Sequence, residues 1–584
     1  MKIVQRTKTD IKEDFVKNLL LDRGILKEDE EFCKKFFKPT KENELDPELL
    51  DNVEEGYQLF KKHLVSGSKF YLIQDSDCDG LTSASLFYNY VKEYLSEYNN
   101  EIIVHIPEGK EHGLDSIMDW FPDEGIDSLI ILPDGGSNDL EQHAELRARG
   151  FEILVLDHHI CDRFSQDAVV INNQPSEHYT NKDLSGVGVV YKFFEYFEKK
   201  ENLPAYSQNY LDLVALGLVG DMMAMFSLEN RFILSYGFTH INNEFFKTLL
   251  AKQDYSMKSQ VNQITVAFYI VPLINSLIRL GSPRDKEELF QAFTQPDLVF
   301  PSTKRGAKTG DTETVCEQMT RICINTKNRQ NKERDKALEL LDIQIMENCL
   351  DENKILILNA EELDIPKTMT GLCAMGVVSK YKKPVILGRT DSNGIFRGSM
   401  RGVNGSELSS FKDFLENSKL MIEVAGHDQA AGASLKFSNI DKLISYSNKQ
   451  LANINFNEGF YEVDFIVNGN CSYLDKMIDE LIEGSEYWGQ NSPEPLIAVE
   501  NISLDTNSIQ YKGKEEKNTV AFVFNGIEYI KFKDSKLVDY LSQFKGKINL
   551  SVVGTPQLNE WCGRITRQIQ IKEIEIKETN EFDF

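Results

Sequence analysis

The alternation of apolar and polar positions divides this chain into parts with different predicted structures. Residues 1–66 are polar, with a helical apolar stripe at Phe15, Leu19 and Leu20, and we expect an amino-terminal helical cap on the first domain. From residue 67 to about 235, short apolar runs alternate with helical patterns, which is typical of a parallel sheet with helices on its faces. The expected strands are residues 71–74, 101–106, 128–132 and 153–156.

The remaining patterns predict a connector, a second α/β unit and a small barrel. Residues 236–350 are largely helical, and residues 351–455 return to alternating strands and helices. Residues 456–577 show repeated period-two alternation, which suggests a small β-barrel such as the OB-fold. The acidic tail, residues 578–584, is expected to be disordered or to act as a docking peptide. The predicted fold class is α/β, with two lobes joined by helices and a carboxy-terminal barrel.

Length and composition favour an ordinary soluble protein of several domains. A chain of 584 residues is too long for one core, and 41% of its residues are hydrophobic and 27% charged. The amino terminus has no apolar signal region, and no apolar run is expected to approach the roughly 18 residues that span a bilayer. We therefore expect a cytoplasmic protein without a membrane partner. Nine cysteines without a Cys-x-x-Cys pair argue against a disulfide framework or a structural zinc site.

The formal net charge of −27 opposes a nucleic-acid partner, because phosphate binding normally leaves a basic footprint. That objection concerns the whole chain and leaves room for a local basic groove. The basic clusters are more simply interpreted as solvated faces until they are placed in space. They comprise Lys304, Arg305 and Lys308; Lys327, Arg329, Lys332, Arg334 and Lys336; and Lys380, Lys382 and Lys383.

Three carboxylates follow the first expected strand of the α/β part. Asp75, Asp77 and Asp79 stand at every second position before Gly80, so in an extended segment their side chains would point to one side. Carboxylates that face one another repel unless a cation lies among them. This spacing predicts a divalent-metal site, and a solvated acidic turn that binds calcium is an equally simple interpretation of this motif alone.

Other apolar segments also end in acidic or imidazole side chains. Asp134 follows residues 129–132, the sequence Asp157-His158-His159 follows residues 153–156, and Asp221 follows residues 216–220. Carboxylates mixed with imidazole suit manganese, zinc or iron, and a carboxylate-rich set favours manganese or magnesium. An isolated His-His pair would more often be structural, but here it recurs with three similar segment ends.

These motifs resemble those of the DHH phosphoesterase family, and more closely its RecJ-like branch of single-strand-specific DNA exonucleases. The four family motifs stand here as Asp75-Ser-Asp77-Cys-Asp79-Gly80, Pro133-Asp134-Gly135, Asp157-His158-His159 and Gly220-Asp221. The segments 184–190 and 229–231 are also similar to that branch. The element His112-Gly113-Leu114 is similar to the family's Gly-Tyr-Gly-Leu but lacks its first half.

The resemblance implies two metal ions, manganese or magnesium, that share one bridging aspartate. Asp134 would be the bridge, and His159 would contact the scissile phosphate while Asp157 orients an imidazole. The other implied ligands are Asp75 and Asp77 for one ion and Asp79, His158 and Asp221 for the second.

The resemblance also implies contacts to the substrate. In the connector, Asn275 and Arg279 match a family segment, although Leu273 and Ile278 replace an arginine and a glycine. A surface arginine paired with a carboxylate is the alternative for Arg279. In the second α/β unit, the family's Gly-Ser-x-Arg and Gly-Gly-His elements stand as residues 398–401 and 425–427, with alanine at 425. They contribute Ser399, Arg401 and His427.

By resemblance, the chain is expected to be a metal-dependent single-stranded DNA exonuclease that works in the 5′-to-3′ direction, releases mononucleotides and serves recombination and repair. A single-strand-binding protein or a helicase would be the accompanying partner. Two alternatives remain: a DHH phosphodiesterase that acts on short oligoribonucleotides or cyclic dinucleotides, and a catalytically idle module that only holds single strands. The terminal barrel argues against the first, and the retained cluster of costly acids and imidazoles argues against the second.

Overall fold

The computed structural model describes residues 2–7, 11–109, 112–161, 163–456, 460–513, 517–561 and 564–577. The acidic tail, residues 578–584, lies outside the described residues. The chain forms two compact units. One unit, named the catalytic unit after the activity expected from its motifs, comprises residues 28–330 and 486–493. The carboxy-terminal unit comprises residues 1–27, 331–485 and 494–584.

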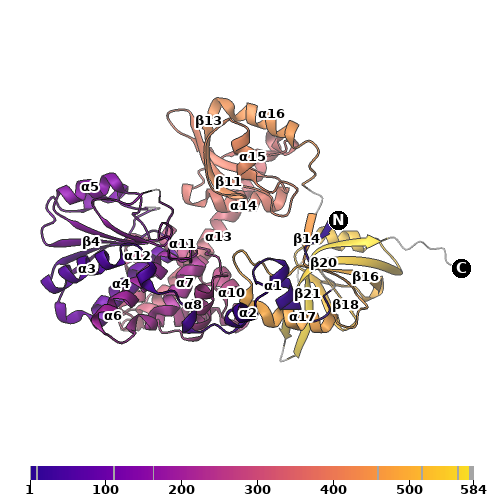
Figure 1. Cartoon of the computed structure of the whole chain (residues 1–584). Helices are drawn as coiled ribbons and strands as arrows, with labels where there is room; N and C mark the ends of the chain where they lie inside the picture. The colour runs from indigo at the N-terminus through magenta and orange to yellow at the C-terminus, as the bar shows by residue number, and fades with distance from the viewer. Residues whose placement is uncertain are drawn as a thin grey trace. The chain divides into compact units, whose positions relative to one another are not determined.

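The catalytic unit is built on a parallel sheet, of which Figure 1 labels β4. The sheet has five strands in the order β3-β2-β4-β5-β6. The predicted α/β class is confirmed, and four of the strands agree with the expected ones to within a few residues. The order reverses beside β2, so the crevice at the carboxyl ends of β2 and β4 is the switch point at which open α/β sheets bind ligands. The strands are β2 (Lys69–Ile73), β3 (Ile102–His105), β4 (Ser128–Pro133), β5 (Glu152–Asp157) and β6 (Val169–Asn172).

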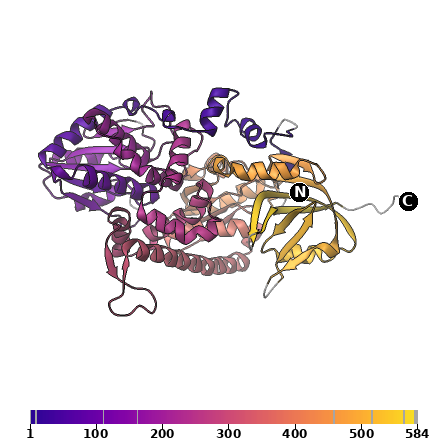
Figure 2. The same cartoon turned by 90° about the horizontal axis from the view of Figure 1, so that it is seen from below.

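Helices cover both faces of this sheet and continue into the connector. Phe60, Phe87 and Phe193 pack edge-on in the core beneath the strands, with ring centroids 5.5 to 5.8 Å apart. The helices are α2 (Glu30–Phe37), α3 (Val53–Ser66), α4 (Cys78–Tyr94), α5 (Leu140–Ala148), α6 (Gly186–Glu201), α7 (Leu211–Gly220), α8 (Leu228–Thr239), α9 (Glu244–Met257), α10 (Gln263–Tyr269), α11 (Val271–Leu280) and α12 (Pro283–Thr294). The short hairpin of β7 (Val299–Pro301) and β8 (Thr312–Thr314) leads into the long helix α13 (Val315–Glu347), and Figure 2 shows the hairpin loop projecting at the start of α13.

One helical stretch of the described chain, Gln263–Leu280, is long and apolar enough by composition to cross a membrane. The expectation of no such run was therefore wrong for this stretch. Half of it is buried inside the protein, and the helix is interrupted at Ile270 between α10 and α11. Those are the properties of a core helix.

The carboxy-terminal unit contains a second α/β part with the five-stranded order β12-β13-β11-β10-β9. Strands β9 and β10 are parallel and the other pairs antiparallel, and α14 packs on β10 and β11. Its elements are β9 (Leu356–Asn359), α14 (Thr370–Tyr381), β10 (Val385–Thr390), β11 (Ile395–Arg401), α15 (Phe411–Asn417), β12 (Met421–His427), β13 (Ala430–Lys436) and α16 (Ile440–Gln450).

The period-two segments form a mixed seven-stranded sheet with the order β15-β16-β20-β21-β19-β18-β17. The long strands β20 and β21 pair along their whole length. The elements are β14 (Phe460–Val463), β15 (Phe465–Asn468), α17 (Leu474–Glu483), β16 (Ile497–Asp505), β17 (Gln510–Lys512), β18 (Thr519–Phe524), β19 (Ile527–Lys531), α18 (Ser535–Leu541), β20 (Lys547–Trp561) and β21 (Arg564–Lys577).

The first residues of the chain belong to this carboxy-terminal unit, so residues 1–66 do not form one cap on the first domain. Strand β1 (Lys2–Gln5) pairs in parallel with β14, and α1 (Phe15–Asp22) packs on α17. Arg23 forms a buried ion pair with Asp464 at 2.8 Å. Only α2 and α3 of the predicted cap lie in the catalytic unit.

A buried histidine in α5 predicts a pH-dependent stability of the catalytic unit. His143 is fully buried, neither ring nitrogen has a hydrogen-bond partner, and burial lowers its pKa from 6.5 to about 4. Below pH 6.5 His143 therefore takes up a proton in the unfolded chain but stays neutral in the folded chain. This difference lowers the free energy of unfolding by about 1.4 kcal/mol for each unit by which the two pKa values differ. The free energy of unfolding should fall between about pH 6.5 and pH 4.

The replacement His143→Leu should flatten this pH dependence in urea unfolding curves, because leucine carries no titratable group. If the free energy of unfolding of His143→Leu depended on pH as that of wild type does, His143 would not be the source of the pH dependence.

Candidate metal centre and substrate surface

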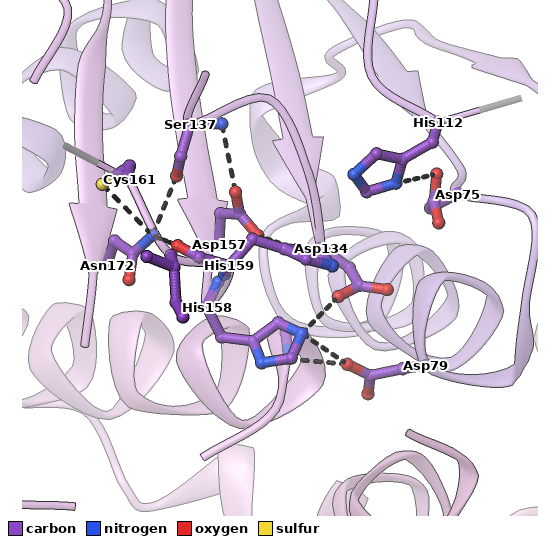
Figure 3. A network of polar contacts seen from close by, with 12 residues as sticks. Asp75, Asp79, His112, Asp134, Ser137, Asp157, His158, His159, Cys161 and Asn172 are labelled. Atoms are coloured by element: carbon purple, nitrogen blue, oxygen red, sulfur yellow. Dashed lines mark hydrogen bonds and ion pairs between the residues drawn. The ribbon is translucent and has the colours of Figure 1, made fainter. Parts of the chain in front are cut away.

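Predicted site residues from four separate segments of the chain meet at the carboxyl edge of the parallel sheet (Figure 3). Asp75 follows β2, Asp134 follows β4, and Asp221 follows α7. Asp157 is the last residue of β5 and is followed by His158 and His159. The sheet order brings β2, β4 and β5 side by side, so side chains far apart in the sequence become neighbours.

The three carboxylates of the first motif do not lie on one extended segment, so the spacing argument for their convergence was wrong. Helix α4 begins at Cys78, before Gly80, and Asp77 is its N-cap, which accepts a hydrogen bond from the Gly80 N–H at 3.0 Å. Asp79 lies in the first turn of α4 and is fully buried. The turn from strand to helix therefore brings these side chains to the centre.

The candidate ligand atoms form groups in which all atoms lie within 4.8 Å of one another. Asp134 is common to two of the groups and His158 to two. The His158 Nε2 atom lies 3.2 Å from Asp134 Oδ1, 3.3 Å from Asp221 Oδ2 and 4.0 Å from Asp79 Oδ2. The groups are Asp75, Asp77 and Asp134; Asp79, His158 and Asp221; and Asp134, His158 and His159.

Two buried atoms at the middle of this cluster have no hydrogen-bond partner. They are Asp134 Oδ1 and His158 Nε2, which face each other at 3.2 Å without forming a hydrogen bond. A buried polar atom without a partner is costly, and both atoms belong to groups that bind divalent cations. The donor set of five carboxylates and one imidazole suits manganese or magnesium, so the residues fit a pair of such ions.

Burial and mutual repulsion disfavour ionisation of these carboxylates when no cation is near. Burial and the charges of Asp77 and other carboxylates raise the pKa of Asp79 to about 6. The same causes raise the pKa of Asp221 to about 8 and that of Asp134 well above its ordinary value. A bound cation reverses this effect, because it favours the charged form.

Three glycines lie so close to these aspartates that a larger side chain at any of the three positions would collide with them. A Cβ atom at Gly217 would lie 2.2 Å from Asp79 Oδ1, and one at Gly186 would lie 2.4 Å from Asp134 Oδ1. A Cβ atom at Gly80 would lie 2.5 Å from the Asp75 Cβ atom. The Gly186 N–H, at the start of α6, also donates to Asp79 at 2.6 Å.

Asp157 is buried behind the histidines and accepts several hydrogen bonds. The backbone N–H groups of Ser137 and His158 donate to it at 3.0 and 2.7 Å, and the His159 Nδ1 atom lies 2.8 Å from it. Although burial opposes ionisation, these partners lower the pKa of Asp157. The His159 ring is 39% exposed, and its bond to Asp157 raises its pKa to about 9 against the effect of burial. This geometry is compatible with the orienting role predicted for Asp157.

His112 also lies in the centre, although the motif analysis assigned it no role there. Its Nδ1 atom lies 3.1 Å from Asp75 Oδ1, and its ring centroid lies 4.8 Å from that of His159. Figure 3 shows its ring beside Asp75, and the side chain is 54% exposed according to its accessible surface. The sequence indicated His112 only through the partial family match at residues 112–114. In the structure, the Leu114 N–H donates a hydrogen bond to Asp139 at 2.7 Å, which holds the backbone of this segment.

The second α/β part places Ser399, Arg401 and His427 on one face of its sheet. Cross-strand partners point to the same face, and β11, β13 and β12 pair Arg401 with Ala430 and Ala430 with His427. Ser399 lies two residues from Arg401, so it shares that face. The face is open at this point, because Ser399 is opposite Gly432.

Sequence analysis missed two residues that complete this face, at the start of α14. The Thr370 hydroxyl lies 2.9 Å from that of Ser399. A Cβ atom at Gly371 would lie 2.6 Å from Arg401 Nη2, so the guanidinium lies directly against the helix N-terminus. A helix N-terminus beside an arginine and two hydroxyls is an anion-binding arrangement.

Asn275 and Arg279 lie on α11 in the catalytic unit, one helical turn apart. Arg279 is exposed, and the Asn275 Oδ1 atom is buried without a hydrogen-bond partner. The carboxylate partner considered for Arg279 is absent among the described residues. Both substrate assignments stay predictions.

Two family models match the chain: the DHH family, N-terminal domain, over residues 69–218, and the RecJ OB domain over residues 470–573. The chain is 35% identical over 572 residues to a Bacillus subtilis strain 168 protein named putative SPbeta prophage-derived single-strand DNA-specific exonuclease YorK, with 97% of each chain covered. It is 25% identical over 583 residues to the single-stranded-DNA-specific exonuclease RecJ of the same organism, which covers 97% of this chain and 69% of that protein.

Among solved structures, RecJ from Thermus thermophilus in complex with Mn²⁺ matches with a TM-score of 0.71 and 18% sequence identity. The match covers 99% of this chain and 80% of that chain. At 18% sequence identity this match shows a similar fold, and it covers both units of the chain.

Proposed function

We infer the reaction from the premise that the chain belongs to the DHH family and, within it, to the RecJ-type single-strand-DNA-specific exonucleases. The chain is an enzyme that hydrolyses phosphodiester bonds of single-stranded DNA with Mn²⁺ or Mg²⁺ as cofactor. By family, it works from the 5′ end, releases mononucleotides and serves recombination and repair.

One observation carries the proposal: buried, unpartnered ligand atoms of Asp134 and His158 lie between two groups of carboxylates. We assign Asp75 and Asp77 to one ion, Asp79, His158 and Asp221 to the other, and Asp134 to both. Ions bound there would lower the pKa of a water molecule and neutralise the charge that develops on the phosphate.

The remaining side chains of the centre act on the substrate or on one another. Asp157 holds the His159 ring through Nδ1, which leaves Nε2 free to donate to a phosphate oxygen. His159 is half-exposed at the open side of the centre, where a strand can reach it. In the carboxy-terminal unit, Thr370, Ser399 and Arg401 supply phosphate donors, and His427 supplies an imidazole on the same face.

Replacing Arg401 by alanine should weaken binding of single-stranded DNA and lower the dependence of affinity on salt. One phosphate contact contributes about 0.7 to the slope of log affinity against log salt for a single strand. The slope should therefore fall by about that amount in titrations of labelled DNA in EDTA. Arg397→Ala is the matched control, because Arg397 lies on the same strand and is paired with Asp391 at 3.4 Å. An unchanged slope for Arg401→Ala would place the phosphate track elsewhere.

A substrate panel separates this function from its alternatives. Purified protein should degrade single-stranded DNA with Mn²⁺ or Mg²⁺, leave duplex DNA intact and do nothing in EDTA. Degradation of short RNA alone would favour the oligoribonuclease alternative. Binding of single strands without hydrolysis under any metal would favour the idle module.

We propose a single-strand-binding protein or a helicase as the accompanying partner, because either would present the single strands that this enzyme degrades. A cytoplasmic location is part of the same proposal. Co-purification of the tagged full chain with either class of protein tests the first point.

A further inference from the structure

Two arginines without an ion pair among the described residues lie near the end of α11. Arg279 lies in the last turn of this helix, and the Arg329 Nη2 atom on α13 donates to the carbonyl of the next residue, Leu280, at 3.1 Å. Both side chains are exposed, and in the part of the chain that the structure describes neither forms an ion pair. Adjacent positive charges without a neutralising acid are unexpected in a chain with a net charge of −27.

The hydrogen bond to Leu280 does not by itself account for Arg329. The last carbonyls of a helix lack intrahelical partners, and a cation there is favourable. That contact uses one of the five N–H donors of a guanidinium and leaves the others directed to solvent. A lysine or a polar amide would cap the helix equally well.

The course of α13 brings Arg329 to the edge of the sheet that carries the catalytic centre. Helix α13 runs antiparallel to α12: the Cys316 Sγ atom contacts the Ala292 carbonyl, and Gln318 donates to Glu288. From Gln318 to Arg329 the helix rises by about 16 Å. Arg329 therefore lies beyond the first turn of α12, next to the α11–α12 junction.

That junction is tied to the loop that carries His112. Lys286, in the first turns of α12, is buried and donates to the backbone carbonyls of Pro107 and Glu108. Pro107 and Glu108 follow β3 at the carboxyl edge of the sheet, and His112 comes four residues later beside Asp75. Arg279 and Arg329 therefore flank the catalytic edge, on the side of the α11–α12 junction.

We propose that Arg329 binds a backbone phosphate of the single strand outside the scissile nucleotide, next to the contact already predicted for Arg279. This inference rests on the proposed function and adds to it a path for the strand over α11 and α13. The N–H donors of Arg329 that Leu280 does not use can contact a phosphate group bidentately. Such contacts recognise the backbone and carry no base preference.

The test is equilibrium binding of a labelled, 5′-phosphorylated dT strand of about 20 nucleotides, longer than one OB-fold covers, in EDTA at several salt concentrations. The replacement Arg329→Ala should weaken binding about three- to tenfold and lower the salt slope by about 0.7. Arg329→Lys should keep most of the slope and lose part of the affinity, because it retains the charge without the planar fork.

Two arginines of the same unit serve as controls. Arg284 is exposed on α12 but paired with Glu288 at 2.7 Å, so Arg284→Ala should change neither affinity nor slope. Arg305 is exposed on the β7–β8 loop, which leads into the start of α13, whereas Arg329 lies near the middle of that helix. Arg305→Ala should also leave binding unchanged, which separates a local contact from an effect of net charge.

Hydrolysis of a 5′-phosphorylated dinucleotide separates a strand contact from damage to the centre. This substrate is too short to reach past the scissile nucleotide, so Arg329→Ala should cleave it at the wild-type rate while its KM for the long strand rises. Equal losses on both substrates, or a salt slope equal to that of Arg284→Ala, would overturn the inference. If wild-type protein hydrolyses no single-stranded DNA, the proposed function fails instead.

Discussion

Replacing Asp134 by alanine should abolish hydrolysis, with a loss of about 10⁴-fold or more in kcat, as when one member of a catalytic unit is removed. Asp134 belongs to two of the three groups of candidate ligands, and no other carboxylate of the described residues belongs to more than one. Quenched time courses with Mn²⁺ and single-stranded DNA measure the effect. Hydrolysis at the wild-type rate would show that Asp134 does not join two ions.

The same variant should fold at least as well as wild type in the absence of metal. The pKa of Asp134 is raised by burial and by the neighbouring carboxylates, so its removal relieves repulsion. Asp212→Asn is the matched control, because Asp212 is also buried and lies in the first turn of the helix α7 that ends before Asp221. Its amide oxygen can still accept from the Asn242 and Asn243 N–H groups, so kcat should be retained.

The second large effect is expected on stability, from replacement of Arg231 by alanine. Arg231 is fully buried in α8 and donates to the Glu486 carbonyl at 2.8 Å and to its carboxylate at 3.0 Å. Its guanidinium carbon lies 5.1 Å from the Phe36 ring centroid and 4.7 Å from that of Tyr487. The side chain therefore holds both α2 and residues 486–493 against α8, and its loss should cost about 2–4 kcal/mol.

Urea unfolding followed by tryptophan fluorescence measures this cost, because Trp488 is buried in the segment that Arg231 holds. Arg149→Ala is the control: Arg149 is paired with Glu145 on the same helical surface, and a partly exposed pair of this kind contributes about 0.5 kcal/mol or less. An Arg231→Ala variant as stable as Arg149→Ala would show that the segment is held by its other contacts.

Much of the catalytic edge is predictable from sequence because parallel strands end at a common edge. Asp134 and the Asp157-His158-His159 run follow apolar strands, so their convergence requires only that the strands be neighbours. The convergence of Asp75, Asp77 and Asp79 was predicted for a wrong reason, since local spacing does not reveal that α4 begins at Cys78. An N-cap aspartate and a first-turn aspartate have the same spacing in sequence as alternate strand residues.

Features that depend on contacts between distant segments could not be predicted. Gly217 lies in α7, which is far from Asp79 in the sequence but packs against it in the structure. Nothing near Gly217 in the sequence indicates that contact. The pairing of β1 with β14 places the first residues in the carboxy-terminal unit, which a helical stripe at Phe15 does not indicate. Likewise, Arg329 resembles any solvated helix residue until α13 is seen to return to the end of α11.

The most direct test of the central claim uses two single-stranded DNA substrates, one labelled at its 5′ end and one at its 3′ end, and follows the labelled products over time. With Mn²⁺, the 5′-labelled strand should give labelled mononucleotide from the first time point. The 3′-labelled strand should shorten progressively, and neither should change in EDTA. Release of the 3′ label first, or intact DNA with Mn²⁺ present, would contradict a 5′-to-3′ metal-dependent exonuclease.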